Sequence, residues 1–205
     1  GVVQRRAAPD LAEPYRIPRS AMIETEPVGD HPDMRKVPGV DFSSGSIGHA
    51  LSNAIGISLA RRWTGGDYTT FCMMGDGEMQ EGQVWEAALF AAQNRMRDLI
   101  AIVDRNGYQL DGKVDDVMNV EPLDQKWAAF GWQVHQVDGH DIAAVTELMR
   151  RLRADDTRDQ PALVIAKTVK GKGVSYMETE PGWHLGWLDP EDAAAAVDEI
   201  KAQVI

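Results

Sequence analysis

The stretch TTFCMMGDG, residues Thr69–Gly77, decides the fold of this chain. An apolar run ends there in a glycine-flanked aspartate, and the pattern returns when LIAIV (Leu99–Val103) passes into DRNG (Asp104–Gly107). Runs that are apolar at almost every position are typical of parallel strands covered on both faces. The helical pattern over Val84–Met96 lies between the two runs, so the sequence predicts a strand, a crossover helix and a neighbouring parallel strand.

Two further apolar runs, Trp132–Val137 and Ala162–Ala166, continue the same spacing of about 30 residues. Helical patterns separate them and also flank the whole series, which predicts a doubly wound α/β fold whose mostly parallel sheet carries helices on both faces. The helices expected besides Val84–Met96 are Ile47–Leu59 with an end near Trp63, Leu123–Phe130, Ile142–Leu152, and Pro190–Val204 with Asp189 as its cap.

The first part of the chain differs from the rest in composition. Six of the ten prolines lie before residue 45, and no apolar period is sustained there. We therefore predict an extended proline-rich arm over residues 1–44 and a compact domain over residues 45–205.

Composition restricts the classes of function. The 21 basic and 32 acidic residues give a formal charge of −11, which argues against nucleic acid or an anionic membrane as a partner. The single cysteine, Cys72, cannot form an intrachain disulfide, as expected in a reducing cytoplasm. No apolar run approaches the roughly 20 residues that cross a bilayer, and no secretory signal is visible at the start. We expect a soluble cytoplasmic protein.

Asp76 lies at the carboxyl end of a predicted strand, where parallel sheets usually bind ligands. The flanking glycines let a ligand approach the backbone, and free amides at the next helix start favour a phosphate. Because a carboxylate repels a phosphate unless a cation lies between them, the pattern indicates Mg²⁺ or Ca²⁺ bound through oxygen atoms. Asn106 ends the next strand, and it joins Asp76 at one edge if the two strands are neighbours.

Two other interpretations of these residues exist. Gly75–Gly77 and Asn106-Gly107 are also common turn sequences, so spacing alone leaves simple turns and a metal site as equal alternatives. A calcium loop of the helix–loop–helix type over Asp104–Asp115 is disfavoured. Gln109 occupies the position that needs glycine, and Asp115 stands where a bidentate glutamate is required.

Five ordered blocks of sequence resemble the transketolase family. Gly75–Ala87 and Leu99–Gly107 look like parts of its thiamine diphosphate fold. The other blocks that are similar to family motifs are Gly45–Gly48, Val137–Asp141 and Lys167–Ser175. The resemblance covers the chain from about Gly29 to His184, and it implies an N-terminal, diphosphate-binding subunit of a thiamine diphosphate-dependent enzyme.

The resemblance also implies site residues. Asp76, Asn106 and the backbone carbonyl of Tyr108 would bind Mg²⁺, with Ca²⁺ as a substitute, and the metal would bridge to the cofactor diphosphate. His31 and His184 resemble catalytic histidines of the substrate channel. The residues implied at the cofactor are Gly45 and Ile47 beside its rings, Gly75 and Gly77 at its diphosphate, and Glu81, which matches a carboxylate at the family's subunit interface.

The sequence departs from the family at three positions near the substrate channel. His49 stands where the family usually has glutamine, Ala50 replaces a glycine, and Leu185 interrupts a histidine–glycine pair. Two further channel histidines would precede Gly1 in a full-length transketolase. The departures therefore concern the substrate channel, while the residues of the metal site match the family.

The resemblance also implies a partner. Ile205 comes before any pyrimidine-binding domain, which in the family supplies the glutamate that activates the cofactor. We therefore expect a separate C-terminal subunit, a heterotetramer and a sugar or 2-oxo acid substrate. Transfer of a two-carbon ketol or related acyl unit is the favoured activity. The alternatives are a non-catalytic scaffold and a 2-oxo acid dehydrogenase-type thiamine subunit.

Overall fold

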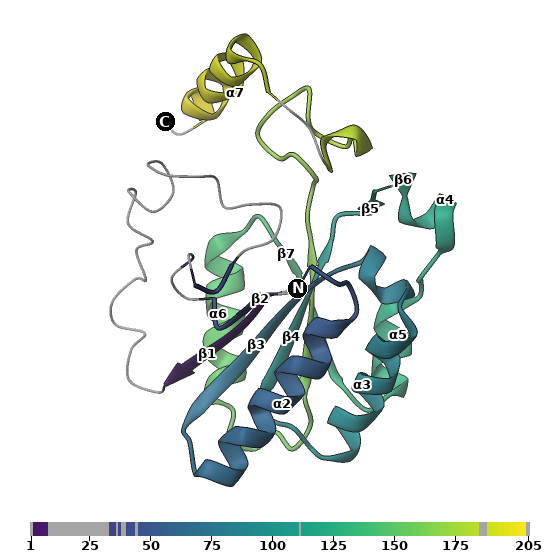
Figure 1. Ribbon diagram of the computed structural model, residues 1–205, viewed down its shortest axis with the longest axis vertical. Helices are drawn as coiled ribbons and strands as arrows, with labels where there is room; N and C mark the ends of the chain where they lie inside the picture. Colours follow the sequence, from purple (N-terminus) through teal and green to yellow (C-terminus); the bar gives the residue numbers. More distant parts are fainter. Residues whose placement is uncertain are drawn as a thin grey trace.

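The computed structural model describes residues 2–7, 33–35, 37, 40–43, 45–110, 112–184 and 188–203. These residues form a twisted six-stranded sheet with helices on both sides (Figure 1). The strand order is β2-β1-β3-β4-β8-β7. The bounds are β1 Val2–Ala7, β2 Phe42–Ser43, β3 Tyr68–Gly75, β4 Leu99–Arg105, β7 Gln133–Asp138 and β8 Ala162–Lys167.

Strands β3, β4, β8 and β7 are parallel, which confirms the four strands and the α/β fold that the apolar runs predict. Their apolar character has a simple cause. Alternate residues of β4 pack on opposite faces, Leu99 and Val103 in one core and Ile100 in the other. Strand β8 divides in the same way, so neither central strand has a face left for polar side chains.

Helices cover the sheet unequally. Helices α2 (His49–Thr64), α3 (Gly82–Gln93) and α5 (Leu123–Ala129) lie over one face, where the larger core contains residues of all three. Helix α6 (Ile142–Ala154) covers the other face through Leu148 and Leu152. Among the described residues, no helix combines the length and apolar character needed to span a membrane.

A cluster of aromatic rings holds α5 to the larger core. Trp127 is fully buried, and its ring centroid lies 4.8 Å from Trp132 and 5.5 Å from Trp85.

We expect Trp127→Ala to lower the free energy of unfolding by about 3–5 kcal/mol, because it leaves a large cavity. Trp63→Ala is the matched control, since Trp63 is 80% exposed, and a change within about 0.5 kcal/mol is expected there. Equal losses in urea unfolding would contradict this packing.

The structure adds two strands from the predicted arm. Strand β1 pairs antiparallel with β3 from Val2↔Met73 to Ala7↔Tyr68, and β2 pairs with β1. The composition predicts an extended arm over residues 1–44, and the structure pairs the backbone of β1 and β2, both from that range, with the sheet. The boundary at residue 45 otherwise stays a prediction.

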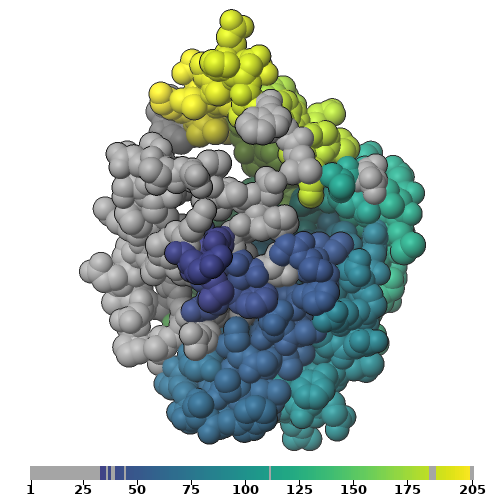
Figure 2. Space-filling model, in the orientation of Figure 1, coloured from purple at the N-terminus to yellow at the C-terminus, as the bar shows by residue number. Residues whose placement is uncertain are grey.

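Five smaller elements were not predicted. They are the turn η2 (Gly77–Gln80), the hairpin β5 (Tyr108–Gln109) and β6 (Gly112–Lys113), the short helix α4 (Val114–Met118), and the turn η3 (Pro181–His184). The final helix, α7 (Pro190–Gln203), was predicted, and the Asp189 carboxylate caps it by accepting from the amides of Glu191 and Asp192 at 2.9 Å. Figure 2 shows α7 as a lobe that projects beyond the body of the domain.

Candidate functional site

The ends of β3 and β4 bring the two principal candidate residues to one edge of the sheet. Gly75 is in register with Asp104, so Asp76 and Asn106 follow neighbouring strands. The backbone amide of Asp76 donates to the carbonyl of Asp104 at 3.2 Å, which joins the two strand ends. This adjacency was the condition on which the predicted shared metal site depended, and the structure meets it.

The Asp76 carboxylate is buried and held by three donors. Only 1% of the residue is exposed. One oxygen accepts from the Gly77 amide at 2.8 Å, and the other accepts from the Gly107 amide at 2.7 Å and the Arg105 guanidinium at 3.1 Å. Burial raises the pKa of Asp76, and the Gly107 amide and Arg105 oppose that shift. An ionised carboxylate offers about four lone-pair positions, so one remains for a further ligand.

Arg105 was not singled out from the sequence. It lies between Asp104 and Asn106, and its guanidinium also reaches Glu121 at 2.8 Å and Asp115 at 3.4 Å. Burial alone would lower the pKa of Arg105, but the carboxylates of Glu121 and Asp76 outweigh burial and raise it. The sequence shows a basic residue within the DRNG run, next to the predicted metal ligand. The spacing of residues does not indicate the three carboxylates that it contacts.

Asn106 is oriented by the backbone that follows it. Its side-chain oxygen accepts from the Tyr108 amide at 2.8 Å, and its side-chain nitrogen donates to Asp104 at 3.2 Å. Thr168, at the end of β8, donates to the other oxygen of Asp104. Asp76, Asn106 and Tyr108 therefore lie on adjoining backbone segments. The carboxylate of Asp76, the side-chain amide oxygen of Asn106 and the backbone carbonyl of Tyr108 are oxygen ligands that suit Mg²⁺. The described residues contain no group of three or more His, Cys, Asp or Glu side chains able to hold a metal. The predicted metal ligands include only one such side chain, Asp76, and therefore do not require such a group.

A second buried carboxylate, Glu78, was also missed although it lies within the GDGE run. It is 6% exposed and accepts from the amides of Gly48 at 2.8 Å and Gly75 at 3.3 Å. Glu78 thus ties the end of β3 to the loop before α2. Gly48 has φ of +84°, and a Cβ there would come within 2.9 Å of the Glu81 side chain, so only glycine fits this approach.

The residues predicted to bind the cofactor lie near this contact between the end of β3 and the loop before α2. Gly75 ends β3 and Gly77 opens η2, where a Cβ would meet Gln109 at 2.9 Å. Glu81 is exposed at the N-terminal cap of α3. Gly45 and Ile47 are exposed in the loop before α2. Their roles stay predictions.

The two predicted catalytic histidines have different outcomes. His31 lies outside the described residues. His184 is exposed at the end of η3, which contacts the β5 strand that follows Asn106. His184 is therefore on the side of the sheet where the strands end. Its catalytic role stays a prediction.

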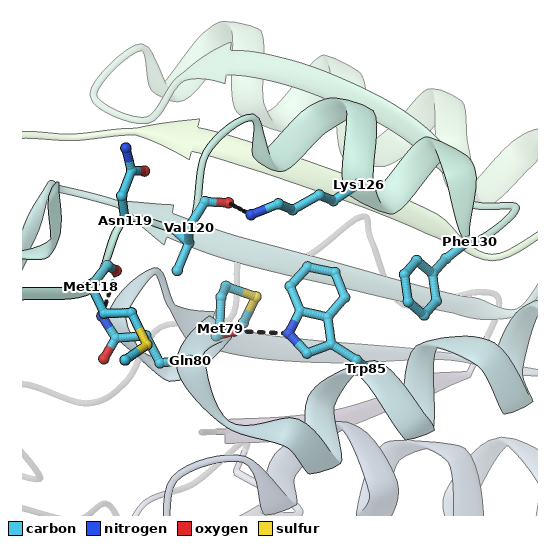
Figure 3. Close-up of a pocket in the computed structure, with 8 residues that line it drawn as sticks. All are labelled: Met79, Gln80, Trp85, Met118, Asn119, Val120, Lys126 and Phe130. Atoms are coloured by element: carbon cyan, nitrogen blue, oxygen red, sulfur yellow. Dashed lines mark hydrogen bonds between the residues drawn. The ribbon is translucent and has the colours of Figure 1, made fainter.

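Two cavities lie near this edge. One of about 480 Å³ adjoins the site and is lined mainly by polar residues of β4, β7, β8 and the start of α5, among them Arg105, Asn106 and Gln136. The other, about 310 Å³, lies between α3 and α5 (Figure 3). In Figure 3, Lys126 and Gln80 turn to the backbone carbonyls of Val120 and Met118, which they reach at 2.8 and 2.9 Å. With its polar groups engaged in this way, the second cavity offers little for a charged ligand.

Comparison with known families agrees with this geometry. Residues 22–201 match the family described as transketolase, thiamine diphosphate binding domain. The chain belongs to the transketolase family. Within it, the chain is 38% identical over 174 residues to one subunit of the apulose-4-phosphate transketolase of Phocaeicola vulgatus, covering 85% of this chain and 61% of that protein. It is 38% identical over 173 residues to 6-deoxy-6-sulfo-D-fructose transketolase subunit SqwG of a Clostridium species, covering 84% and 62%.

Solved transketolases share the fold. The enzyme of Campylobacter jejuni superposes with a TM-score of 0.76 at 26% identity, covering 87% of this chain and 28% of that one. The Pichia stipitis transketolase in complex with sedoheptulose 7-phosphate gives 0.75 at 26% identity, covering 83% and 26%. The chain thus spans about three fifths of the length of the transketolase subunits from Phocaeicola and Clostridium.

Proposed function

We propose that this chain is the thiamine diphosphate-binding subunit of a split transketolase-like enzyme that requires Mg²⁺. The observation that carries the proposal is the placement of Asp76 and Asn106 at the ends of the adjacent strands β3 and β4, in a domain of the transketolase family. Thiamine diphosphate, when bound, supplies the carbanion chemistry of two-carbon transfer. The residues of this chain would bind and orient it.

The residues at the ends of β3 and β4, and those of the loop before α2, each have a role in this proposal. Asp76, Asn106 and the Tyr108 carbonyl would hold Mg²⁺ with Ca²⁺ as a substitute, and the Gly77 amide would donate to the diphosphate. Glu78 keeps the loop that contains Gly45 and Ile47 against the end of β3, so the segment next to the cofactor rings is fixed before binding. His184 would contact substrate.

The proposal is tested by calorimetric titration of thiamine diphosphate with Mg²⁺, with Ca²⁺ and with EDTA. Binding should require a divalent cation. Equal affinity in EDTA would contradict the metal site, and no binding in any condition, with or without a partner subunit, would favour the scaffold alternative.

A partner subunit is part of the proposal. The relatives from Phocaeicola vulgatus and Actinobacillus succinogenes are each named as one subunit of an apulose-4-phosphate transketolase, which supports a second chain that carries the pyrimidine domain. We propose a cytoplasmic heterotetramer of the two subunits. Mass photometry of the co-purified chains should give twice the summed mass of one copy of each.

The donor is proposed to be a specialised ketose rather than an ordinary pentose phosphate. His49, which is exposed at the start of α2, differs from the usual family residue, while the metal residues match. Ala50 also differs, but it is buried in the larger core and does not line a channel. Two relatives are named for apulose 4-phosphate and 6-deoxy-6-sulfofructose, which supports a shifted channel. Altered polar contacts cost about 1–3 kcal/mol each, so pentose phosphates should react roughly 10²-fold less efficiently than the true donor.

A donor panel measures this difference. The reconstituted enzyme would be given ketose phosphates, non-phosphorylated ketoses and 2-oxo acids. Activity on a pentose phosphate equal to that of a full-length transketolase would refute the specialised channel. A preference for 2-oxo acids would favour the dehydrogenase-type alternative.

A further inference from the structure

Arg105 contacts three carboxylates at once, each through a different guanidinium nitrogen. Nε lies 2.8 Å from Glu121, Nη1 lies 3.1 Å from Asp76, and Nη2 lies 3.4 Å from Asp115. The Arg105 side chain is only 17% exposed. Of the three partners, one is a proposed metal ligand and two are not.

Asp76 therefore has two possible cationic partners. A carboxylate this deeply buried requires a positive or hydrogen-bonding partner, and Arg105 supplies the positive one here. Mg²⁺ held by Asp76 would need an oxygen of the same carboxylate that Arg105 contacts. A guanidinium on that carboxylate would repel the ion.

We propose that Arg105 competes with Mg²⁺ for Asp76, and that metal binding releases the guanidinium from Asp76 while its contacts with Glu121 and Asp115 remain. This inference rests on the proposed function in one respect, since it takes Asp76 as a metal ligand. Arg105 would then be a positioning residue that keeps the buried carboxylate neutralised until the metal arrives.

The neighbouring residues provide a place for the displaced guanidinium. Glu121 is fixed, because its second oxygen accepts from the Leu123 amide at 2.7 Å and Leu123 is buried. Its contact with Arg105 is also the shortest of the three ion pairs. Glu121 is therefore the stronger anchor, and the more exposed Asp115 is the weaker one.

The competition predicts opposite signs for two substitutions. Arg105→Met keeps much of the side-chain bulk but removes the charge, so Mg²⁺ should bind about tenfold more tightly in the presence of thiamine diphosphate. Glu121→Gln removes the anchor and leaves Arg105 on Asp76, so Mg²⁺ should bind more weakly, by about tenfold. In the Arg105→Met background the Glu121→Gln effect should disappear, because its mechanism needs the guanidinium.

The experiment is calorimetric titration of MgCl₂ into the full chain at saturating thiamine diphosphate, with the Mg²⁺-induced shift in melting temperature as a second readout. Arg150→Met is the matched control, because Arg150 is exposed and forms its ion pair with Glu147, at 2.6 Å on the exposed side of α6. It should leave Mg²⁺ affinity unchanged. Circular dichroism checks folding, and Arg105→Gln replaces Arg105→Met if that variant is unfolded.

The outcomes separate this inference from the proposed function. Wild-type binding with unchanged or weaker affinity in Arg105→Met overturns the competition and leaves the metal site intact. If neither protein binds Mg²⁺ alone, the titration is repeated with the partner subunit, and absence of binding in both proteins there overturns both ideas. Tighter binding in Arg105→Met, or binding gained only in that variant, supports the competition.

Discussion

Asp76→Ala should abolish Mg²⁺-dependent binding of thiamine diphosphate while leaving the fold intact. Asp76 supplies the only side-chain carboxylate proposed as a metal ligand, and it sits after the last residue of β3 rather than within the sheet core. Loss of outer-shell partners alone typically costs 10–100-fold in metal affinity, so loss of this ligand should cost at least ~100-fold. Titration calorimetry at fixed MgCl₂ measures the loss.

Asp116→Ala is the control for that experiment. Asp116 is an exposed carboxylate in the first turn of α4, close in sequence to Asp115 but outside the set of carboxylates that contact Arg105. Its cofactor affinity should equal that of the wild type. Unchanged affinity in Asp76→Ala would remove Asp76 from the metal site, and the simple-turn interpretation of Gly75–Gly77 would then hold.

The purified chain alone should show no measurable turnover, and a pyrimidine-domain subunit should restore it. The cofactor residues Gly45, Ile47 and Glu81 are exposed in the structure, so one side of the proposed cofactor site needs cover from elsewhere. Coupled assays of the chain, the partner and their mixture at matched Mg²⁺ and cofactor measure the effect. Cofactor affinity should rise with turnover.

The matched control uses the same mixture with Asp76→Ala, which should assemble without recovering activity. Full activity of the isolated chain would refute the split arrangement. Restored cofactor binding without turnover on any donor would instead favour a partner-dependent scaffold.

The sequence predicted the four parallel strands because a buried parallel strand leaves a strong local signal. In β4 and β8 nearly every residue must be apolar, since both faces pack against a core. The same logic placed Asp76 and Asn106 together, because successive parallel strands end at one edge.

The contacts that hold this edge could not be predicted from local patterns. Arg105 meets Asp115 and Glu121 across a hairpin and a short helix, whose geometry no motif indicates. Glu78 meets Gly48 across 30 residues. Strand β1 pairs with β3 over a still longer separation, and the polar sequence Gln4-Arg5-Arg6 is not typical of a strand.

The antiparallel pairing of β1 has a consequence for handling this chain. Without β1, strand β3 would be the outermost of the described strands, with a row of unsatisfied backbone amides and carbonyls. Such rows are templates for pairing with other molecules and for aggregation. The proline-rich composition suggests residue 45 as a starting point for a shortened protein. Such a truncation would remove β1 and expose the edge of β3, the strand that leads to Asp76. Strands of other molecules could then pair with β3.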